Sequence, residues 1–192
     1  MNRSRIRGLY AITPDLADTG ALACRVRSAL AGGARLIQYR NKSAAEQTRL
    51  DQARMLVSLC REFDALLIIN DHVDLTLEVG ADGAHLGAED GSVGDARGKL
   101  GPGKILGMSC YNRLDLARGA VKLGADYVAF GSFFSSSVKP GAVIAAPGLL
   151  RQAKAELALP LVAIGGITTA NGRILVEAGA YALAVITAVF SA

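Results

Sequence analysis

The sequence has no tryptophan and little aromatic content of any kind. Aromatic residues make up 5% of the 192 residues, and no cluster of lysine and arginine is interleaved with them. Such clusters are typical of nucleic-acid-binding surfaces, so we expect no nucleic-acid partner. The three cysteines stand far apart, with neither a CxxC pair nor the ligand spacing of a zinc site. Isolated thiols are typical of a reducing compartment, and we expect the protein in the cytoplasm.

A long hydrophobic run is missing as well. Residues 161–192 are mostly apolar, but they are interrupted by Gly165-Gly166, Asn171-Gly172-Arg173 and Glu177. A membrane helix needs about 20 consecutive apolar residues, so we expect no membrane span and no membrane partner. The first seven residues hold three arginines and are not followed by the apolar region of a signal peptide. The net charge of +4 is mild, and basic residues gathered in one pocket for an anionic substrate would account for it.

Aliphatic residues and glycine dominate what is present. Hydrophobic residues make up 51% of the chain, and 22 residues are glycine. Short apolar runs alternate with longer amphipathic stretches from end to end, which predicts strands alternating with helices. The predicted strands are 8–13, 34–40, 65–69, 83–86, 105–109, 127–131, 161–164 and 181–186. The predicted helices are 20–31, 43–62, 72–79, 92–99, 113–123, 147–157 and 170–178, with a helical stub at the end.

Eight such β-α units, without a break in composition, predict one α/β domain over residues 1–192. Strands that alternate with helices form a parallel sheet, and eight apolar strands predict its closure into a (β/α)8 TIM barrel. An open, doubly wound sheet is the alternative fold. Two local signals mark where helices begin and end. Ser43 and Glu46 have the spacing of a capping box at the start of a helix. The phrase Gly-Ala-Asp at 80–82 and 124–126 indicates a glycine that ends a helix before the next strand.

Polar side chains follow the apolar runs, and the clearest group follows the second predicted strand. Gln38, Arg40 and Lys42 stand at alternate positions, which share one face of an extended chain. One amide and two cations on a single face are suited to bind a phosphate or a diphosphate. A solvated strand end is the alternative. Because the active site of a barrel lies at the carboxyl ends of its strands, polar residues after the other strands would join this group at one mouth.

Two acidic residues are candidate metal ligands. Asp71 follows the third predicted strand and Asp90 the fourth, and a pair of carboxylates near cations suits Mg²⁺ held jointly with substrate phosphates. The alternatives are a helix N-cap for Asp71 and a turn residue for Asp90. The two histidines receive no catalytic role: we expect His72 to face solvent on a helix and His85 to lie within the barrel.

Two loops complete the predicted mouth. Lys139 lies in a serine-rich loop, 132–146, which would either clamp an anion as a lid or form an ordinary solvated loop. Gly165-Gly166 follows the seventh predicted strand, where barrels commonly bind phosphate through backbone N–H groups and the dipole of a following helix. The sequence therefore predicts two anion sites, one cationic and linked to a metal, and one made of backbone.

Seven segments in a fixed order carry a family resemblance. They are 8–15 (GLYAITPD), 38–42 (QYRNK), 69–71 (IND), 83–90 (GAHLGAED), 107–110 (GMSC), 124–131 (GADYVAFG) and 163–168 (AIGGIT). Together they are highly specific, and over nearly its whole length the chain resembles the thiamine-phosphate synthase family. The resemblance implies a (β/α)8 transferase of thiamine biosynthesis, which joins 4-amino-2-methyl-5-hydroxymethylpyrimidine diphosphate to a thiazole phosphate and releases diphosphate.

The resemblance also implies a role for each matching residue. The pyrimidine diphosphate contacts would be Gln38, Arg40, Lys42, Asn70, Ser109 and Lys139. The Mg²⁺ ligands would be Asp71 and Asp90, and the thiazole-phosphate contacts would be Ser136, Val138, Gly166, Ile186 and Thr187. The reaction of the family is regarded as dissociative, so the catalytic residues Arg40, Lys42 and Lys139 would stabilise the departing diphosphate together with Mg²⁺.

The sequence departs from the family pattern in the serine-rich loop. The family loop usually reads Pro-Thr-x-Thr-Lys, and Val138 here lacks the hydroxyl of the second threonine, which predicts a raised KM for the thiazole phosphate. Thr187 replaces a usual serine and keeps a hydroxyl. The alternative functions are a thiazole tautomerase-like isomerase and a non-catalytic thiazole-phosphate-binding protein, neither of which needs the diphosphate and metal residues. The sequence is compatible with a homo-oligomer.

Overall fold

The molecule folds as a closed barrel of eight parallel strands. In this computed structural model, which describes residues 3–87, 90–135, 141 and 143–190, the strands pair in chain order and β8 pairs with β1. The strands are β1 (Gly8–Ile12), β2 (Leu36–Tyr39), β3 (Leu66–Asn70), β4 (Gly83–Leu86), β5 (Ile105–Tyr111), β6 (Tyr127–Phe130), β7 (Leu161–Ile164) and β8 (Ala182–Val185). The closed ring confirms the predicted (β/α)8 TIM barrel and excludes the open sheet, whose two edge strands would each lack a neighbour.

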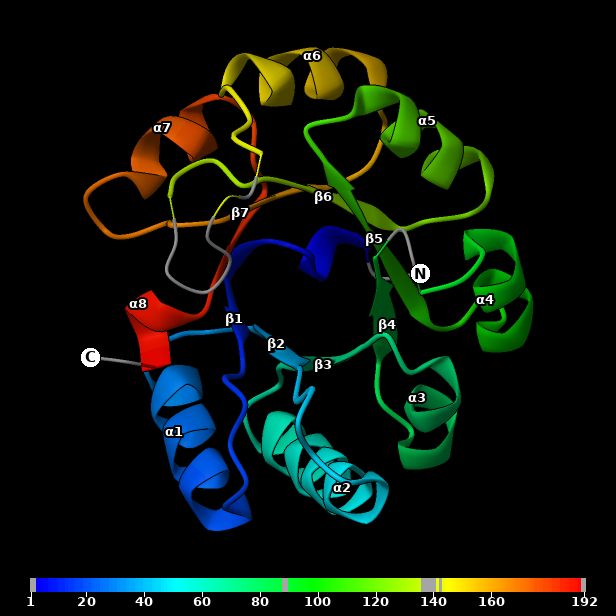
Figure 1. The fold of residues 1–192 in the computed structure, drawn as a ribbon, viewed down its shortest axis with the longest axis vertical. Coiled ribbons are helices and arrows are strands. Elements are labelled where there is room, and N and C mark those ends of the chain that lie inside the picture. The colour runs from blue at the N-terminus through cyan, green and yellow to red at the C-terminus, as the bar shows by residue number, and fades with distance from the viewer. Residues whose placement is uncertain (1–2, 88–89, 136–140, 142, 191–192) are drawn as a thin grey trace.

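Helices surround the ring of strands (Figure 1). They are α1 (Thr19–Ala31), α2 (Glu46–Glu62), α3 (Val73–Val79), α4 (Val93–Leu100), α5 (Leu114–Lys122), α6 (Gly148–Glu156), α7 (Gly172–Glu177) and α8 (Thr187–Phe190). Within the described ranges, no helix is both long enough and apolar enough to cross a membrane.

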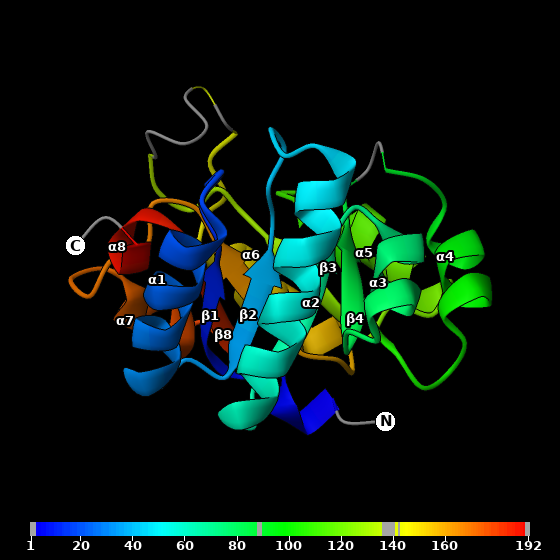
Figure 2. The same ribbon diagram turned by 90° about the horizontal axis from the view of Figure 1, so that it is seen from below.

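The barrel interior is filled by alternate residues of the strands. This interior cluster contains Tyr10, Ile12, Leu36, Leu66, Ile68, Ile105, Tyr127, Ala129, Val162, Ala182 and Ala184. Glycine makes room for the larger members: a Cβ atom on Gly107 would lie 2.1 Å from Cζ of Tyr127. Ile6, which follows the short 3-10 helix η1 (Arg3–Arg5), belongs to the same cluster and is 1% exposed. Figure 2 shows η1 at the end of the barrel opposite the loops that follow the strands.

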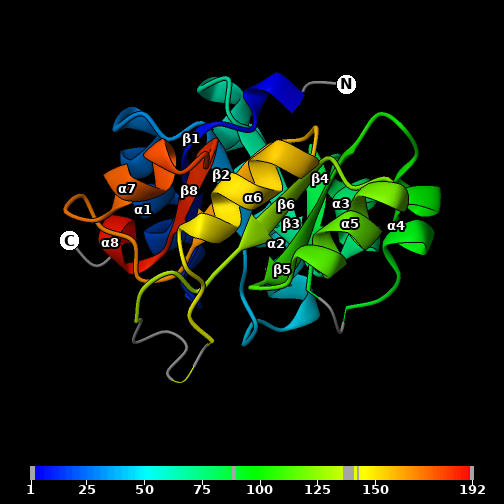
Figure 3. The same cartoon turned by 90° about the horizontal axis from the view of Figure 1, so that it is seen from above.

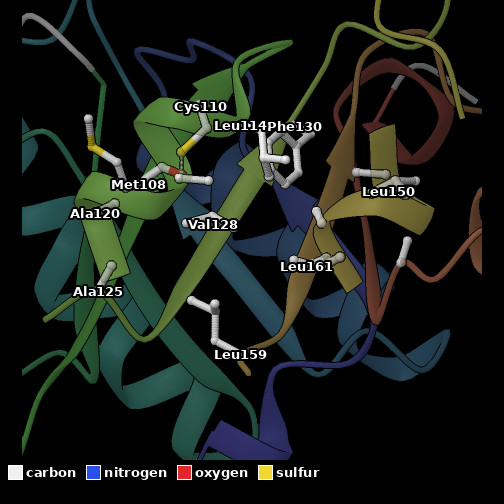
Figure 4. Close-up of a cluster of buried hydrophobic side chains, with 14 of the residues drawn as sticks. Met108, Cys110, Leu114, Ala120, Ala125, Val128, Phe130, Leu150, Leu159 and Leu161 are labelled. Atoms are coloured by element: carbon white, nitrogen blue, oxygen red, sulfur yellow. Dashed lines mark hydrogen bonds between the residues drawn. The ribbon is translucent and has the colours of Figure 1, made fainter. Parts of the chain in front are cut away.

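A second apolar layer lies between the strands and the helices. Figure 4 shows one part of it, where Val128, Phe130 and Leu161 of the barrel lie near Leu114 and Leu150. The last two residues come from α5 and α6, which cover this side of the barrel (Figure 3). Burial of such aliphatic and aromatic side chains stabilises the fold by about 1.5–3 kcal/mol for each fully buried residue.

The repeated phrase Gly-Ala-Asp has a structural explanation. Gly80 and Gly124 follow α3 and α5 with φ values of 69° and 94°, the left-handed conformation that glycine adopts most easily. Asp82 and Asp126 then each accept a hydrogen bond from a backbone N–H of the preceding strand, at 2.8 and 2.9 Å. The phrase therefore ends a helix and fastens the chain to the neighbouring strand.

The predicted capping box at the start of α2 is wrong. The helix begins at Glu46 after Ala45, and in the described chain no side-chain hydrogen bond caps it. Ser43 instead donates to Oδ1 of Asn41 at 3.1 Å, and the Asn41 amide donates to the carbonyl of Leu16 at 2.8 Å. Ser43 thus belongs to the loop after β2, because a buried polar network holds that loop in place before the helix starts.

Candidate active site

The predicted phosphate-binding residues of β2 lie at the carboxyl end of the barrel. Gln38 is 4% exposed and faces the interior. The Arg40 side chain is 25% exposed and the Lys42 side chain 62% exposed. The three residues therefore run from the floor of the mouth to its rim, as their alternation predicts.

Two residues after β1 hold the end of β2, and the sequence analysis gave them no role. The Thr13 hydroxyl accepts from the backbone N–H of Arg40 and donates to its carbonyl, both at 2.9 Å. The Asp15 carboxylate pairs with the Arg40 guanidinium at 3.2 Å and accepts from the Lys42 backbone N–H at 2.9 Å. Thr13 and Asp15 thus position the two cations, and their place at the carboxyl end of the first predicted strand is the signal that could have found them.

The two predicted metal ligands and the two cations form one electrostatic cluster. Nζ of Lys42 lies 3.9 Å from Oδ2 of Asp71. Burial, followed by the neighbouring Asp90 carboxylate, raises the pKa of Asp71 to about 6, while the charges of Lys42 and Arg40 act in the opposite direction. Two carboxylates that repel each other beside two cations are suited to share a divalent cation with an anion.

The backbone at Asp71 is held in an unusual conformation. Its φ is 63°, in the left-handed region that non-glycine residues seldom adopt. Its N–H donates to the carbonyl of His85 at 2.8 Å, across to β4, which keeps the carboxylate at the mouth. Asp71 does not cap α3: the N-cap residue is His72, which is exposed as expected. The N-cap alternative for Asp71 is therefore wrong, and the strained conformation is consistent with a functional constraint.

Asp90 closes a turn and also borders a groove. Its Oδ2 accepts from the N–H of Gly87 at 2.7 Å, and its own N–H donates to the carbonyl of Gly87 at 3.4 Å, as the turn alternative predicts. The groove has a volume of about 610 Å³, and Asp71, Asp90, Ser92 and Lys99 are among its lining residues. Within the described residues, no group of three or more His, Cys, Asp or Glu side chains could hold a metal. Two carboxylates alone fit Mg²⁺, which usually takes one or two protein carboxylates and completes its shell with water and phosphate oxygens.

Asn70 joins this cluster at the end of β3. A small cavity of about 20 Å³, room for about one water molecule, is lined by Lys42, Asn70 and Asp71 together with Arg49 and other residues. Asn70 therefore lies beside the Lys42–Asp71 pair, as the sequence predicts.

A chain of hydrogen bonds crosses the barrel interior below the mouth. Nε2 of Gln38 donates to Oη of Tyr10 at 2.9 Å, and Oη of Tyr10 lies 2.8 Å from Oη of Tyr127. Nδ1 of His85 lies 2.9 Å from Oη of Tyr127, and Nε2 of His85 lies 2.9 Å from Oγ of Ser109. The two predicted substrate contacts at the ends, Gln38 and Ser109, are thus linked through three buried residues of β1, β6 and β4.

His85 lies within the barrel as expected, and it is uncharged. Burial lowers its pKa to about 4, although the charge of Asp90 acts in the opposite direction. At neutral pH the ring therefore carries one proton, on either Nδ1 or Nε2.

Two glycines follow β7 at the place of the predicted backbone cup, and a helix follows them after a turn. Gly165 and Gly166 have φ values of 102° and 61°, and a Cβ atom on Gly166 would lie 2.4 Å from the carbonyl oxygen of Ser135. Both glycines are thus required by the close approach of the segment after β6. α7 begins at Gly172, two residues later than predicted, because Asn171 accepts from the N–H of Thr168 at 2.8 Å and forms a turn first. The contribution of a helix dipole stays a prediction.

The remaining predicted contacts lie at two places. Ile186 and Thr187 follow β8, on the same end of the barrel as Gly166, and Thr187 opens α8. Ser136, Val138 and Lys139 lie outside the described residues. In the described chain, the residues predicted to bind the thiazole phosphate and those predicted to bind the diphosphate thus come from different arcs of one mouth.

Comparison with known proteins identifies the family. A family model described as "Thiamine monophosphate synthase" matches residues 9–189. The chain is 56% identical to thiamine-phosphate synthase of Nitrosospira multiformis over 190 residues, which cover 99% of this chain and 81% of the relative. The chain belongs to the thiamine monophosphate synthase family. The resemblance stated from the sequence is therefore confirmed.

Two further comparisons with members of the thiamine monophosphate synthase family agree. Thiamine-phosphate synthase of Methylobacillus flagellatus is 54% identical over 187 residues, which cover 97% of this chain and 89% of the relative. The solved structure of thiamine phosphate pyrophosphorylase from Pyrococcus furiosus matches with a TM-score of 0.87 at 38% identity. The match covers 99% of this chain and 90% of the Pyrococcus furiosus chain. The match extends over the whole barrel.

Proposed function

We propose that this protein is a thiamine-phosphate synthase, a transferase of thiamine biosynthesis. It couples 4-amino-2-methyl-5-hydroxymethylpyrimidine diphosphate with a thiazole phosphate and gives thiamine phosphate and diphosphate. The observation that carries the proposal, beyond family membership, is the cluster of Arg40, Lys42, Asp71 and Asp90 at the carboxyl end of the barrel. A tautomerase or a thiazole-phosphate sensor would have no use for such a cluster.

In this proposal Asp71 and Asp90 hold Mg²⁺ together with the diphosphate. The residues fit the ion: two hard carboxylates face each other, and their mutual repulsion is part of what raises the pKa of Asp71 to about 6. When bound, Mg²⁺ would neutralise part of the charge that develops on the departing diphosphate.

The chain's own contribution to the reaction is charge stabilisation and positioning. The bond between the pyrimidine methylene carbon and the diphosphate oxygen breaks, and its electron pair leaves with the diphosphate. Arg40 and Lys42, with Lys139, stabilise that negative charge. The thiazole nitrogen then gives its lone pair to the methylene carbon, so no proton has to be moved and no general base is needed.

Positioning of the thiazole is assigned to the other arc of the mouth. Gly166, Ile186 and Thr187, with Ser136 and Val138, would hold its phosphate so that the nitrogen lies close to the methylene carbon. Support comes from the segment after β6, whose Phe134 N–H donates to the carbonyl of Gly165 at 3.0 Å and so brings that segment against the glycines. Gln38, Asn70 and Ser109 would bind the pyrimidine diphosphate.

Localisation and assembly follow from the same proposal. We propose a cytoplasmic protein, in keeping with buried thiols at Cys60 and Cys110. A homo-oligomer stays a prediction of the sequence.

The experiment mixes both substrates with Mg²⁺ and measures thiamine phosphate and diphosphate. We expect both products in equal amounts from the wild type. We expect Arg40→Gln to lower kcat/KM by about 10- to 100-fold, the range for a lost hydrogen bond to a charged group. Arg35→Gln is the matched control, because Arg35 is exposed at the opposite end of the same strand. Retained thiazole-phosphate binding without product would favour the sensor and contradict the proposal.

A further inference from the structure

We propose that Tyr10, Tyr127 and His85 are positioning residues that fix the hydrogen-bond polarity of Gln38 and Ser109 together. Gln38 then presents an acceptor, its Oε1, and Ser109 presents a donor, its hydroxyl proton, to the bound aminopyrimidine diphosphate. This inference rests on the proposed function, because it assumes that Gln38 and Ser109 both contact that substrate.

The direction of the chain follows from counting protons. Each tyrosine hydroxyl has one proton to donate, and a neutral imidazole has one N–H and one acceptor nitrogen. Gln38 Nε2 donates to Tyr10 at 2.9 Å, and a buried hydroxyl proton needs an acceptor, so we assign the Tyr10 proton to Tyr127, 2.8 Å away. The Tyr127 proton is then donated to Nδ1 of His85 at 2.9 Å.

The direction of the hydrogen bond between His85 and Ser109 then follows. With Nδ1 of His85 as an acceptor, the ring proton lies on Nε2 and is donated to Oγ of Ser109, 2.9 Å away. The Ser109 hydroxyl accepts this bond and keeps its own proton for a ligand.

With the opposite hydrogen-bond polarity, Gln38 would offer a donor and Ser109 an acceptor to the ligand. If the Gln38 amide were reversed, each hydrogen bond between Gln38 and Ser109 would exchange its donor and acceptor. Ser109 would then donate its proton to His85. Gln38 would then offer N–H groups and Ser109 only lone pairs. We assign the amino group of the pyrimidine to Oε1 of Gln38 and a diphosphate oxygen to the Ser109 hydroxyl. The amino group donates and the diphosphate oxygen accepts, so for this pairing the polarity in the structure is the complementary one. We call the hydrogen-bonded series Gln38–Tyr10–Tyr127–His85–Ser109 the relay. The relay thus couples recognition at one end of the substrate to recognition at the other.

Packing keeps the relay from exchanging partners with water. Tyr10 is 1% exposed and Tyr127 is 0% exposed. The Tyr10 and Tyr127 rings meet edge to face at 6.1 Å, and the His85 ring stacks on Tyr127 at 5.5 Å. Gly107 leaves the space that the Tyr127 ring fills. Because every ring is fixed, removal of one hydroxyl interrupts the relay without an obvious replacement.

A purely structural role for these hydroxyls makes a different prediction. In that case, loss of the Tyr127 hydroxyl would lower stability and leave the protonation of His85 and the substrate preferences unchanged. The tests therefore need measurements that a change in stability alone does not alter.

The first test is the tautomer of His85, read from the ¹⁵N NMR shifts of its ring in the free protein. The chain has only two histidines, so a His72→Gln variant assigns the signals. We expect the Nε2–H tautomer in the wild type and a mixture of both tautomers in Tyr127→Phe. An Nδ1–H tautomer in the wild type, or an unchanged tautomer in the variant, would overturn the relay. This test needs no substrate, so it stands apart from the synthase assignment.

The second test is steady-state kinetics of Tyr127→Phe. We expect KM for the pyrimidine diphosphate to rise roughly three- to tenfold, as for one weakened hydrogen bond, and KM for the thiazole phosphate to stay unchanged. The matched control is Tyr39→Phe, because the Tyr39 hydroxyl is also buried but donates to Gln52 at 2.8 Å, outside the barrel. Equal effects of the two variants on both KM values would overturn the inference. A wild type without synthase activity would instead overturn the proposed function.

Discussion

The raised pKa of Asp71 predicts that the metal-free protein is destabilised by its own metal site. Burial and the Asp90 carboxylate raise this pKa from 3.8 to about 6. In the unfolded chain the carboxyl loses its proton near pH 3.8, whereas in the folded protein it keeps it until about pH 6. Between these values the folded state binds more protons, so stability falls as the pH rises through this window and stays lower above it. We therefore expect Asp71→Asn to be more stable than the wild type at neutral pH.

The magnitude follows from the same shift. A rise in pKa from 3.8 to about 6 corresponds to an upper limit of about 3 kcal/mol. Water reaches this carboxylate and screens its interactions, so we expect about 1 kcal/mol. For a chain of this size, such a gain raises the Tm by about 2–4 °C.

The assay is thermal or urea unfolding at several pH values between 4 and 8, with metal removed. We expect the advantage of Asp71→Asn to be near zero at pH 4, to grow up to pH 6 and to be constant above. Added Mg²⁺ should stabilise the wild type and leave the variant unchanged. Asp74→Asn is the control, because the Asp74 side chain is 82% exposed and pairs only at the surface with Lys99. A variant that is less stable than the wild type at every pH would refute the reasoning.

Three further predictions concern positioning, stability and the serine-rich loop. Asp15→Asn should raise KM for the pyrimidine diphosphate by roughly tenfold, because it removes the ion pair that orients Arg40; an unchanged KM in steady-state kinetics would contradict this. Arg97→Met should lower the free energy of unfolding in urea by about 3–5 kcal/mol, because it leaves the Asp126 carboxylate, 1% exposed, without its guanidinium partner; kcat/KM at low temperature should not change. Val138→Thr should lower KM for the thiazole phosphate by restoring a hydroxyl, and a variant that binds no better would show that the loop does not use it.

The fold could be predicted from local patterns because each pattern has a local cause. Apolar runs formed the strands, which are four to seven residues long, and glycines such as Gly80 ended helices in the left-handed conformation that the sequence predicts. The start of α2 could not be predicted in this way. Ser43 has the right spacing for a cap, but its hydroxyl is used by Asn41, which is itself held by a residue more than twenty positions earlier.

The sequence predicts the individual residues of the candidate site but not the hydrogen-bond network that joins them. Gln38 and Ser109 were assigned from strand ends and family resemblance. Their link was not visible, because Tyr10 and Tyr127 stand 117 positions apart and meet only when the barrel closes. His85 was correctly expected inside the barrel, but its partners depend on the register of β4 against β5 and of β5 against β6. Long-range contacts of this kind need the three-dimensional structure.

The most direct test of the central claim is calorimetry of inorganic diphosphate with and without Mg²⁺. The claim is that Asp71 and Asp90 hold the ion against the diphosphate beside Arg40 and Lys42. We expect Mg²⁺ to tighten diphosphate binding to the wild type and to have no such effect on the Asp71→Asn, Asp90→Asn double variant. An equal gain from Mg²⁺ in both proteins would contradict the account.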